Sequence, residues 1–189
     1  MRRQKSKPDD KKTKELIKKA RLVLFIIIGI VIFIKLNKKL FFMVIFSALA
    51  FAGKQIRGQF GLKLIVLDPL MFLAIMVAKF LSLTDAVIFI ALNTLVVDFI
   101  TNIASEGTFF NFGFYSIGTV VGVSLFGGFD MMIYGNIASL IYSIEYVLFR
   151  FFIIPQDPFG SVMKAATSFM FTFFYLTFFG PLLKLLMTL

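Results

Sequence analysis

Long apolar runs separated by short polar breaks make up most of this chain, and they predict a series of helices. Beyond residue 21 the runs are nearly continuous, without the strict alternation that is typical of a half-buried strand. Apolar runs with few charges are typical of membrane-spanning helices, whereas the strands of a membrane barrel alternate and are about half as long. We therefore expect an all-α polytopic membrane protein.

The breaks between the runs define the expected helices and domains. A basic tail, 1–21, is followed by an extra N-terminal membrane segment, 22–35, and by a six-helix membrane domain, 36–189. The apolar run 22–34 has 13 residues, about 20 Å of helix against a hydrocarbon core of about 30 Å, so it either crosses the membrane or only embeds in it. The helices expected after it cover residues 40–52, 70–81, 86–103, 112–126, 131–152 and 162–189, the last kinked at Gly180-Pro181.

The connections between these helices differ in length. Residues 36–39, 82–85 and 127–130 read as short turns, whereas 53–66, 103–111 and 153–161 read as long polar loops. Successive loops of a membrane bundle alternate sides, so we expect the three long loops on one face. Such loops can line and cover a binding pocket.

The stretch 68–111 has the most informative polar pattern. Asp68-Pro69 and Thr84-Asp85 are expected to start two helices, because an acidic or hydroxyl side chain can cap free N–H groups and proline is tolerated in a first turn. The second helix carries the polar residues Asn93, Thr94, Asp98, Thr101 and Asn102. Thr94, Asp98 and Thr101/Asn102 are spaced four and three to four residues apart, which places them on one face.

A charged group at the bilayer centre costs roughly 2.5–3.5 kcal/mol, so the intramembrane polar residues should face protein or water. Asp98 and Glu145 are the deepest acids by position, and they either hold a small ligand or fix helix register. In the register interpretation Glu145 pairs with Arg150 or Tyr142, and Asp98 with Asn93 or Thr94. For Asn93 and Asn136 a bond between helices is the favoured role. The candidate ligand-binding residues are Asp98, Glu145, Asn93, Asn136, Glu106, Asn111, Tyr115 and Tyr142.

Composition supports the membrane class and narrows the chemistry. Of 189 residues, 59% are hydrophobic, 27 are Phe, and none is Cys or His. Soluble domains are about 45–50% apolar. Without Cys or His the chain lacks the residues for thiol chemistry, for zinc or haem ligation and for a His base, so we expect no enzyme, no cofactor and no metal. It has no nucleotide-binding loop either, so ATP-driven transport would require separate ATPases.

Ten of the twenty Lys and Arg residues lie in 1–21. Such a tail is either a topology anchor or a contact for acidic lipid or nucleic acid, and the anchor is the favoured interpretation. We expect a cell-membrane protein with a cytoplasmic N-terminus. Nucleic acid is not an expected partner, because the tail lacks interleaved aromatic residues.

Ala48 and Ala52 form an AxxxA pair in the run 40–52, and a long connection to Asp68-Pro69, a short helix, a tight turn, a helix with a polar file and a glycine-bearing helix follow. In this layout the chain resembles the substrate-binding (S) component of energy-coupling-factor transporters, whose six-helix fold the rod-shape protein MreD is also thought to share. The resemblance implies a six-helix S-component-like bundle plus one extra N-terminal hydrophobic segment. It also implies that Ala48 and Ala52 contact a transmembrane coupling subunit, which works with ATPases.

Three functions follow as hypotheses. The first is a substrate-binding subunit of such an importer, which captures a small molecule under the loops 53–66, 103–111 and 153–161. The second is an MreD-like structural or scaffolding protein of the cell envelope, without a ligand. The third is a channel, exporter or lipid-handling protein of another kind.

Overall fold

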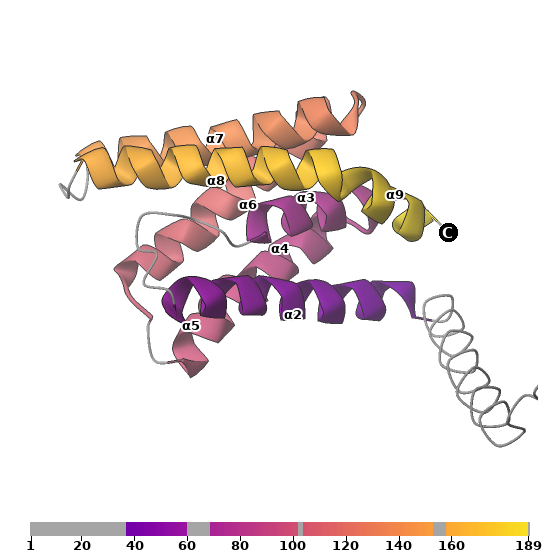
Figure 1. Cartoon of the computed structure of the whole chain (residues 1–189), viewed down its shortest axis with the longest axis horizontal. Helices are drawn as coiled ribbons and strands as arrows, with labels where there is room; N and C mark the ends of the chain where they lie inside the picture. Colours follow the sequence, from indigo (N-terminus) through magenta and orange to yellow (C-terminus); the bar gives the residue numbers. More distant parts are fainter. Residues whose placement is uncertain (1–36, 60–68, 102–103, 153–157, 189) are drawn as a thin grey trace, which may run out of the picture. The chain divides into compact units, whose positions relative to one another are not determined.

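The computed structural model describes residues 37–59, 69–101, 104–152 and 158–188, which are helical almost throughout and contain no strand. The chain divides into two compact units, Met1–Phe41 and Phe42–Leu189, and the packing described below is that of the second (Figure 1). The predicted tail 1–21 and segment 22–35 lie outside the described residues. The helices are α2 (Lys38–Gln59), α3 (Leu70–Phe80), α4 (Leu83–Ala91), η1 (Leu92–Val96), α5 (Val97–Ile100), α6 (Glu106–Phe126), α7 (Met131–Phe152), α8 (Pro158–Phe178) and α9 (Gly180–Thr188).

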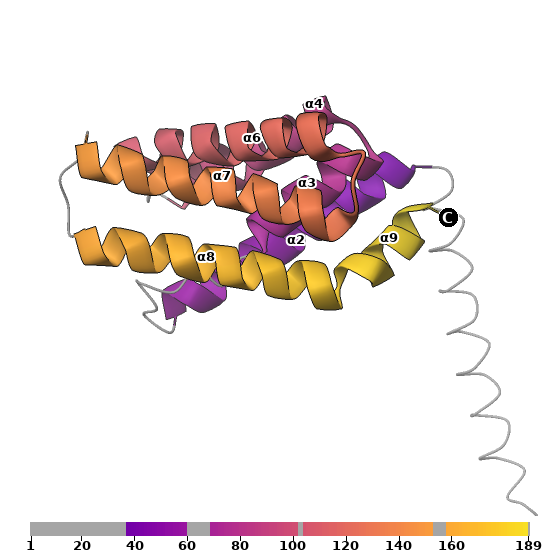
Figure 2. The same cartoon turned by 90° about the horizontal axis from the view of Figure 1, so that it is seen from above.

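The short helix α3 is the centre of the second unit. It is apolar on all sides, and the first nine of its eleven residues, Leu70 to Ala78, are all buried. A helix that is apolar all round has no face for water, and α3 is accordingly packed against α4, α6, α7, α8 and α9 (Figure 2). At its end, Lys79 donates a hydrogen bond to the carbonyl of Gly127, which ties α3 to the turn between α6 and α7.

Small residues bring the longer helices together. In α6, a Cβ built on Gly118 would lie 2.8 Å from the carbonyl oxygen of Ala138 in α7, and one on Gly122 would collide with Ala138 itself. Gly118 and Gly122 therefore allow α6 and α7 to approach closely. Between α7 and α8, which run side by side in Figures 1 and 2, Ser143 bonds to the carbonyl of Ala165 at 3.3 Å.

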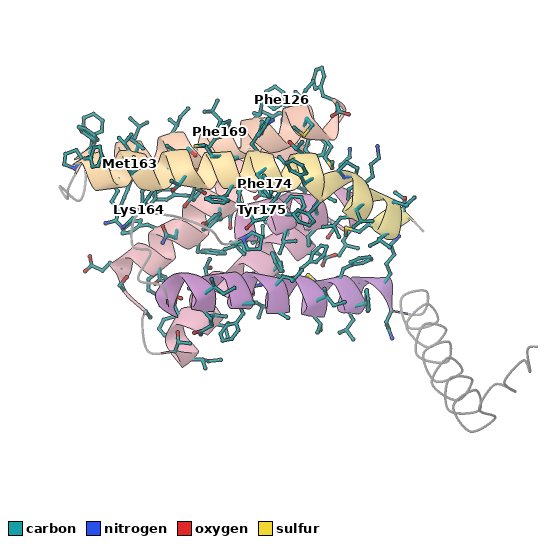
Figure 3. All side chains as sticks on the ribbon, viewed as in Figure 1. Phe126, Met163, Lys164, Phe169, Phe174 and Tyr175 are labelled. Carbon is teal, nitrogen blue, oxygen red and sulfur yellow. The ribbon has the colours of Figure 1, made fainter. Side chains whose placement is uncertain are left out.

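The described helices have the lengths and the surfaces of a multi-pass membrane protein. Four of them, α2, α4 to α5, α6 and α7, are long and apolar enough to cross a membrane, and the pair α8 and α9 is a fifth if it forms one bent span. The bend is 55° and falls between Phe178 and Gly180, next to the kink predicted at Gly180-Pro181. The side chains along α8 include Met163 and Lys164 near its start and Phe174 and Tyr175 near its end (Figure 3). Many of the outward-facing side chains are large and apolar, as a lipid-facing surface requires.

Three expected boundaries are wrong. The residues of the predicted long loops that the structure describes are largely helical: 53–59 extend α2, 106–111 open α6 and 158–161 open α8. The second turn is also shorter than expected. Ser82, not Thr84 or Asp85, caps α4, and its hydroxyl accepts a hydrogen bond from the amide of Asp85 at 3.0 Å.

Candidate functional site

A polar pocket of about 100 Å³ lies inside this apolar bundle. It is placed where α2 and α5 approach their ends and where α3 and α6 begin. Its volume corresponds to about three water molecules, at about 30 Å³ each. Pockets for drug-sized ligands measure roughly 300–1,000 Å³, so this pocket suits a much smaller ligand. The lining residues are Ala50, Lys54, Leu70, Asn93, Thr94, Asp98, Asn111 and Tyr115.

A single π-helical turn, η1, supplies two of the polar lining residues. Widened turns of this kind are frequent at functional sites. The amide nitrogen of Asn93 donates to the carbonyl of Phe89 at 2.8 Å and to the hydroxyl of Ser47 in α2 at 3.0 Å. The hydroxyl of Thr94 donates to the carbonyl of Ile90 at 2.6 Å. These bonds hold both side chains in the pocket wall and join η1 to α2.

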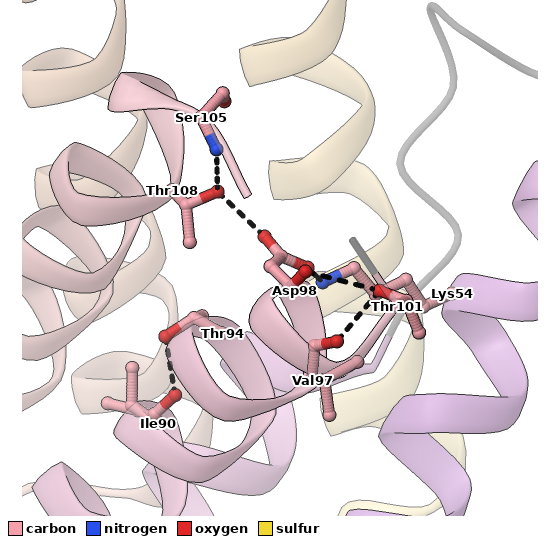
Figure 4. A network of polar contacts seen from close by, with 8 residues as sticks. All are labelled: Lys54, Ile90, Thr94, Val97, Asp98, Thr101, Ser105 and Thr108. Atoms are coloured by element: carbon pink, nitrogen blue, oxygen red, sulfur yellow. Dashed lines mark hydrogen bonds and ion pairs between the residues drawn. The ribbon is translucent and has the colours of Figure 1, made fainter. Parts of the chain in front are cut away.

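Asp98 is the centre of the charged part of the pocket (Figure 4). One carboxylate oxygen forms an ion pair with the ammonium of Lys54 in α2, and the other accepts a hydrogen bond from the hydroxyl of Thr108 in α6 at 2.9 Å. Thr108 in turn accepts from the backbone amide of Ser105 at 3.2 Å, as part of a capping box at the start of α6. The carboxylate therefore connects three separate helical segments through charge-assisted bonds.

One aromatic side chain, that of Tyr115 in α6, lines the pocket, and aromatic side chains of α7 pack behind it. The ring of Tyr115 is stacked on that of Tyr142, with a centroid distance of 4.3 Å and an interplanar angle of 13°. Tyr142 also packs against Tyr146 at 6.1 Å, and the guanidinium of Arg150 lies 5.5 Å from the ring centre of Tyr146. Offset stacks of this kind hold aromatic rings in a fixed geometry. Tyr142 therefore supports the pocket through Tyr115.

The structure brings together four of the eight ligand-binding candidates, Asn93, Asp98, Asn111 and Tyr115. Tyr142 lies directly behind Tyr115. The other three candidates are not among the residues that line the pocket. Glu106 is exposed in the first turn of α6, and Asn136 and Glu145 each have a buried side-chain oxygen without a hydrogen-bond partner among the described residues.

The expected partners of Asp98 were wrong, since the structure pairs it with Lys54 and Thr108 instead of Asn93 or Thr94. The sequence does carry a signal for Lys54. It continues the buried stripe Phe42, Phe46 and Ala50 at a spacing of four residues, although Gly53 before it predicts the start of a loop. Thr108 follows Ser105 at the spacing of a capping box, which is a second signal in the sequence.

The predicted partner-binding residues, Ala48 and Ala52, are both exposed, while Ala50 between them is buried. Beside Ala52 lies an apolar groove of about 470 Å³, between α2, the start of α3 and the bend from α8 to α9. Its lining residues are Leu49, Ala52, Gly53, Ile56, Pro69, Phe72, Leu73, Tyr175, Phe179, Leu182 and Leu183. Small side chains on an outward-facing helix surface allow another helix to approach closely.

The pocket holds one carboxylate, and across the described ranges no three Asp or Glu side chains gather in the manner of a metal centre. A single carboxylate, an ammonium, amides and hydroxyls can hold a small polar or charged molecule. Compared with protein-family models, with curated proteins and with solved structures, the chain matches none.

Proposed function

We propose that this protein is a membrane-embedded solute-binding subunit of an importer, similar in role to the S component of energy-coupling-factor transporters. The bound solute is small and polar and occupies the pocket around Asp98. In this proposal a transmembrane coupling subunit docks on the surface around Ala48 and Ala52, and separate ATPases supply the energy.

The observation that carries the proposal is the convergence of polar side chains in one pocket of an otherwise apolar bundle. Asn93, Asp98 and Asn111 come from separate turns and helices and line the same space. Polar groups inside a membrane bundle are expensive and mark solute or ion pathways more often than other sites.

The order of the helices is compatible with the proposed relationship. Grouped as α2, α3, α4 to α5, α6, α7 and α8 to α9, the described elements form six segments, with a short second one. The exposure of Ala48 and Ala52 fits a docking surface for a coupling subunit. These features support the S-component-like role, and the bound solute itself must be found by experiment.

A second candidate function is the MreD-like one, a scaffold without a ligand. It is favoured by the ion pair between Lys54 and Asp98, which already satisfies the carboxylate and joins α2 to α5. In this view the pocket is a by-product of a polar contact that fixes helix register. The two candidates predict different results when the charge of Asp98 is removed.

The test is to purify the full chain in mild detergent, extract it and identify retained small molecules by mass spectrometry. We expect a polar solute in stoichiometric amount with the native protein and its loss in Asp98→Asn. The matched control is Glu145→Gln, which removes an acid of the same bundle that does not line the pocket, and which should keep the solute. No retained solute, with a lower melting temperature in Asp98→Asn, would favour the scaffold.

A further inference from the structure

The hydrogen bonds around the pocket determine which kind of ligand it can accept. Asn93 is only 5% exposed, and its amide nitrogen donates to the carbonyl of Phe89 and to Ser47. A carbonyl can only accept, so the nitrogen must be the atom that faces Phe89, and the amide orientation follows. The amide oxygen accepts no hydrogen bond among the described residues. Asn93 therefore offers the pocket an acceptor.

Thr94 and Asp98 have the same character. The single hydroxyl proton of Thr94 is donated to the carbonyl of Ile90, which leaves only the lone pairs of the oxygen. Asp98 is an acceptor at both oxygens, and one of them already accepts a hydrogen bond from the hydroxyl of Thr108. The remaining polar lining residues, Asn111 and Tyr115, can accept as well as donate. The deep part of the pocket is thus a set of oxygen acceptors around one negative charge.

In this structure the ammonium of Lys54 supplies the positive charge that these acceptors require. The two partners differ in access to solvent, since the side chain of Lys54 is 30% exposed and that of Asp98 only 12%. A long, flexible lysine at the pocket edge can move outward, whereas the carboxylate on its helix stays in place. Lys54 therefore resembles a tethered cation that a free cation can replace.

We propose that the pocket is a binding site for a small monovalent cation, which replaces the ammonium of Lys54 at Asp98. This inference rests on the proposed function, because it names the chemical class of the solute held by the same pocket. The single carboxylate balances one positive charge, and a volume of about 100 Å³ suits a small cation such as a bare ion, ammonium or a short alkylammonium. We expect a bulky organic cation to bind poorly, and an anion would meet acceptors and Asp98.

The experiment compares chloride salts of potassium, ammonium, methylammonium and the bulky N-methylglucamine at equal ionic strength, on the full chain in detergent. In the native protein, a small cation that displaces Lys54 should increase the acetylation of Lys54, read by peptide mass spectrometry. Lys184 on α9, which is exposed, serves as the internal control and should not respond. Potassium tests for an inorganic ion, whereas ammonium and methylammonium test for an ammonium-type solute. In Asp98→Asn, none of these salts should change the acetylation of Lys54.

A second arm measures melting temperatures. Lys54→Met removes the tethered competitor, so it should be destabilised in N-methylglucamine chloride and rescued by the small cation. If the ion pair closes the site about nine-tenths of the time, this variant should bind the cation about tenfold more tightly than the native protein. Lys54→Met with Asp98→Asn should show no rescue. If Lys54→Met does not fold, the acetylation of the native protein still decides.

The inference is overturned if no small cation changes the acetylation of Lys54, or if the stabilisation persists in Asp98→Asn. A neutral or anionic solute that is retained through Asp98 would refute the cation inference and leave the proposed binding function standing. If the protein neither retains a solute nor responds to a cation, both fail together.

Discussion

Thr108 is the residue on which the environment of Asp98 depends most directly. Its hydroxyl donates to the carboxylate at 2.9 Å and accepts from the amide of Ser105 at 3.2 Å, so one side chain satisfies two buried groups. A buried ion pair by itself adds little net stability, because desolvation offsets most of the attraction. The neutral donor beside it therefore matters, since it satisfies the second oxygen of Asp98 without a further charge.

We expect Thr108→Val to lower the free energy of unfolding by about 1–3 kcal/mol, because the near-isosteric change leaves a buried carboxylate oxygen and a cap amide without their partner. The measurement is the thermal melting temperature in detergent. Thr177→Val is the matched control, because the hydroxyl of Thr177 is exposed and bonds to the carbonyl of its own helix at Phe173, at 2.8 Å. Equal melting temperatures for the two variants would contradict the role given to Thr108.

Spacing alone predicts the polar residues of the helix expected over 86–103, but it does not predict their partners. Asn93, Thr94 and Asp98 recur at one and four residues, which is enough to place them on adjoining faces of one helix. Which helix faces them depends on tertiary packing that has no local pattern. Glu145 shows the limit from the other side: it is as isolated an acid in the sequence as Asp98, yet it does not line the pocket.

Among the elements, α6 and α7 make the contact most sensitive to side-chain size. A Cβ on Gly122 would collide with Ala138, whereas one on Gly113 of the same helix would meet nothing within 4 Å. We expect Gly122→Ala to cost about 1–3 kcal/mol by overpacking, measured as a fall in melting temperature. Gly113→Ala should instead stabilise, by up to about 1 kcal/mol, because alanine favours helix over glycine. The opposite signs distinguish packing from propensity, and a fall in both variants would speak against the close approach.

The presence of each helix was predictable because the apolar runs are long. The predicted ends of the helices were wrong where polar residues continue a helix. Gly53 and the charged residues after it predict a loop over 53–66, but α2 continues to Gln59. Lys54 lies within this helix and pairs with Asp98, a tertiary contact that no local pattern records. The bend at Gly180-Pro181 was predictable, since the missing proline N–H acts locally. The π-helical turn η1 has no sequence signature that we can identify.

At the scale of the whole molecule, the two ends of α6 should lie on opposite sides of the membrane. The helix has 21 residues, about 32 Å, which matches the thickness of the hydrocarbon core. The chain has no native cysteine, so single cysteines at Glu106 and Gly128, both exposed, can be labelled separately. We expect an impermeant thiol reagent to label one of them in intact cells and the other only after lysis. Labelling of both from one side would show that α6 does not cross.

The surface around Ala48 and Ala52 separates a subunit of an assembly from a solitary bundle. Both side chains are exposed, so Ala48→Leu with Ala52→Leu should leave the free energy of unfolding of the isolated protein within about 0.5 kcal/mol of the native value, with a nearly unchanged melting temperature. The same variant should lose membrane partners that co-purify with the native chain, because leucine side chains hold a docking helix away from the α2 backbone.

The control for this last prediction lies between the two positions. Ala50 is on the same helix but only 4% exposed, and it lines the polar pocket. Ala50→Leu should therefore lower the free energy of unfolding by about 1–3 kcal/mol through overpacking, seen as a fall in melting temperature. A stable double variant that no longer assembles, beside an unstable Ala50→Leu, is the result expected of an outward docking surface. A double variant that melts as early as Ala50→Leu would place the alanine pair inside the packing of this chain. One that keeps every partner would remove the pair from the interface and, with it, the main residue-level support for a coupled transporter.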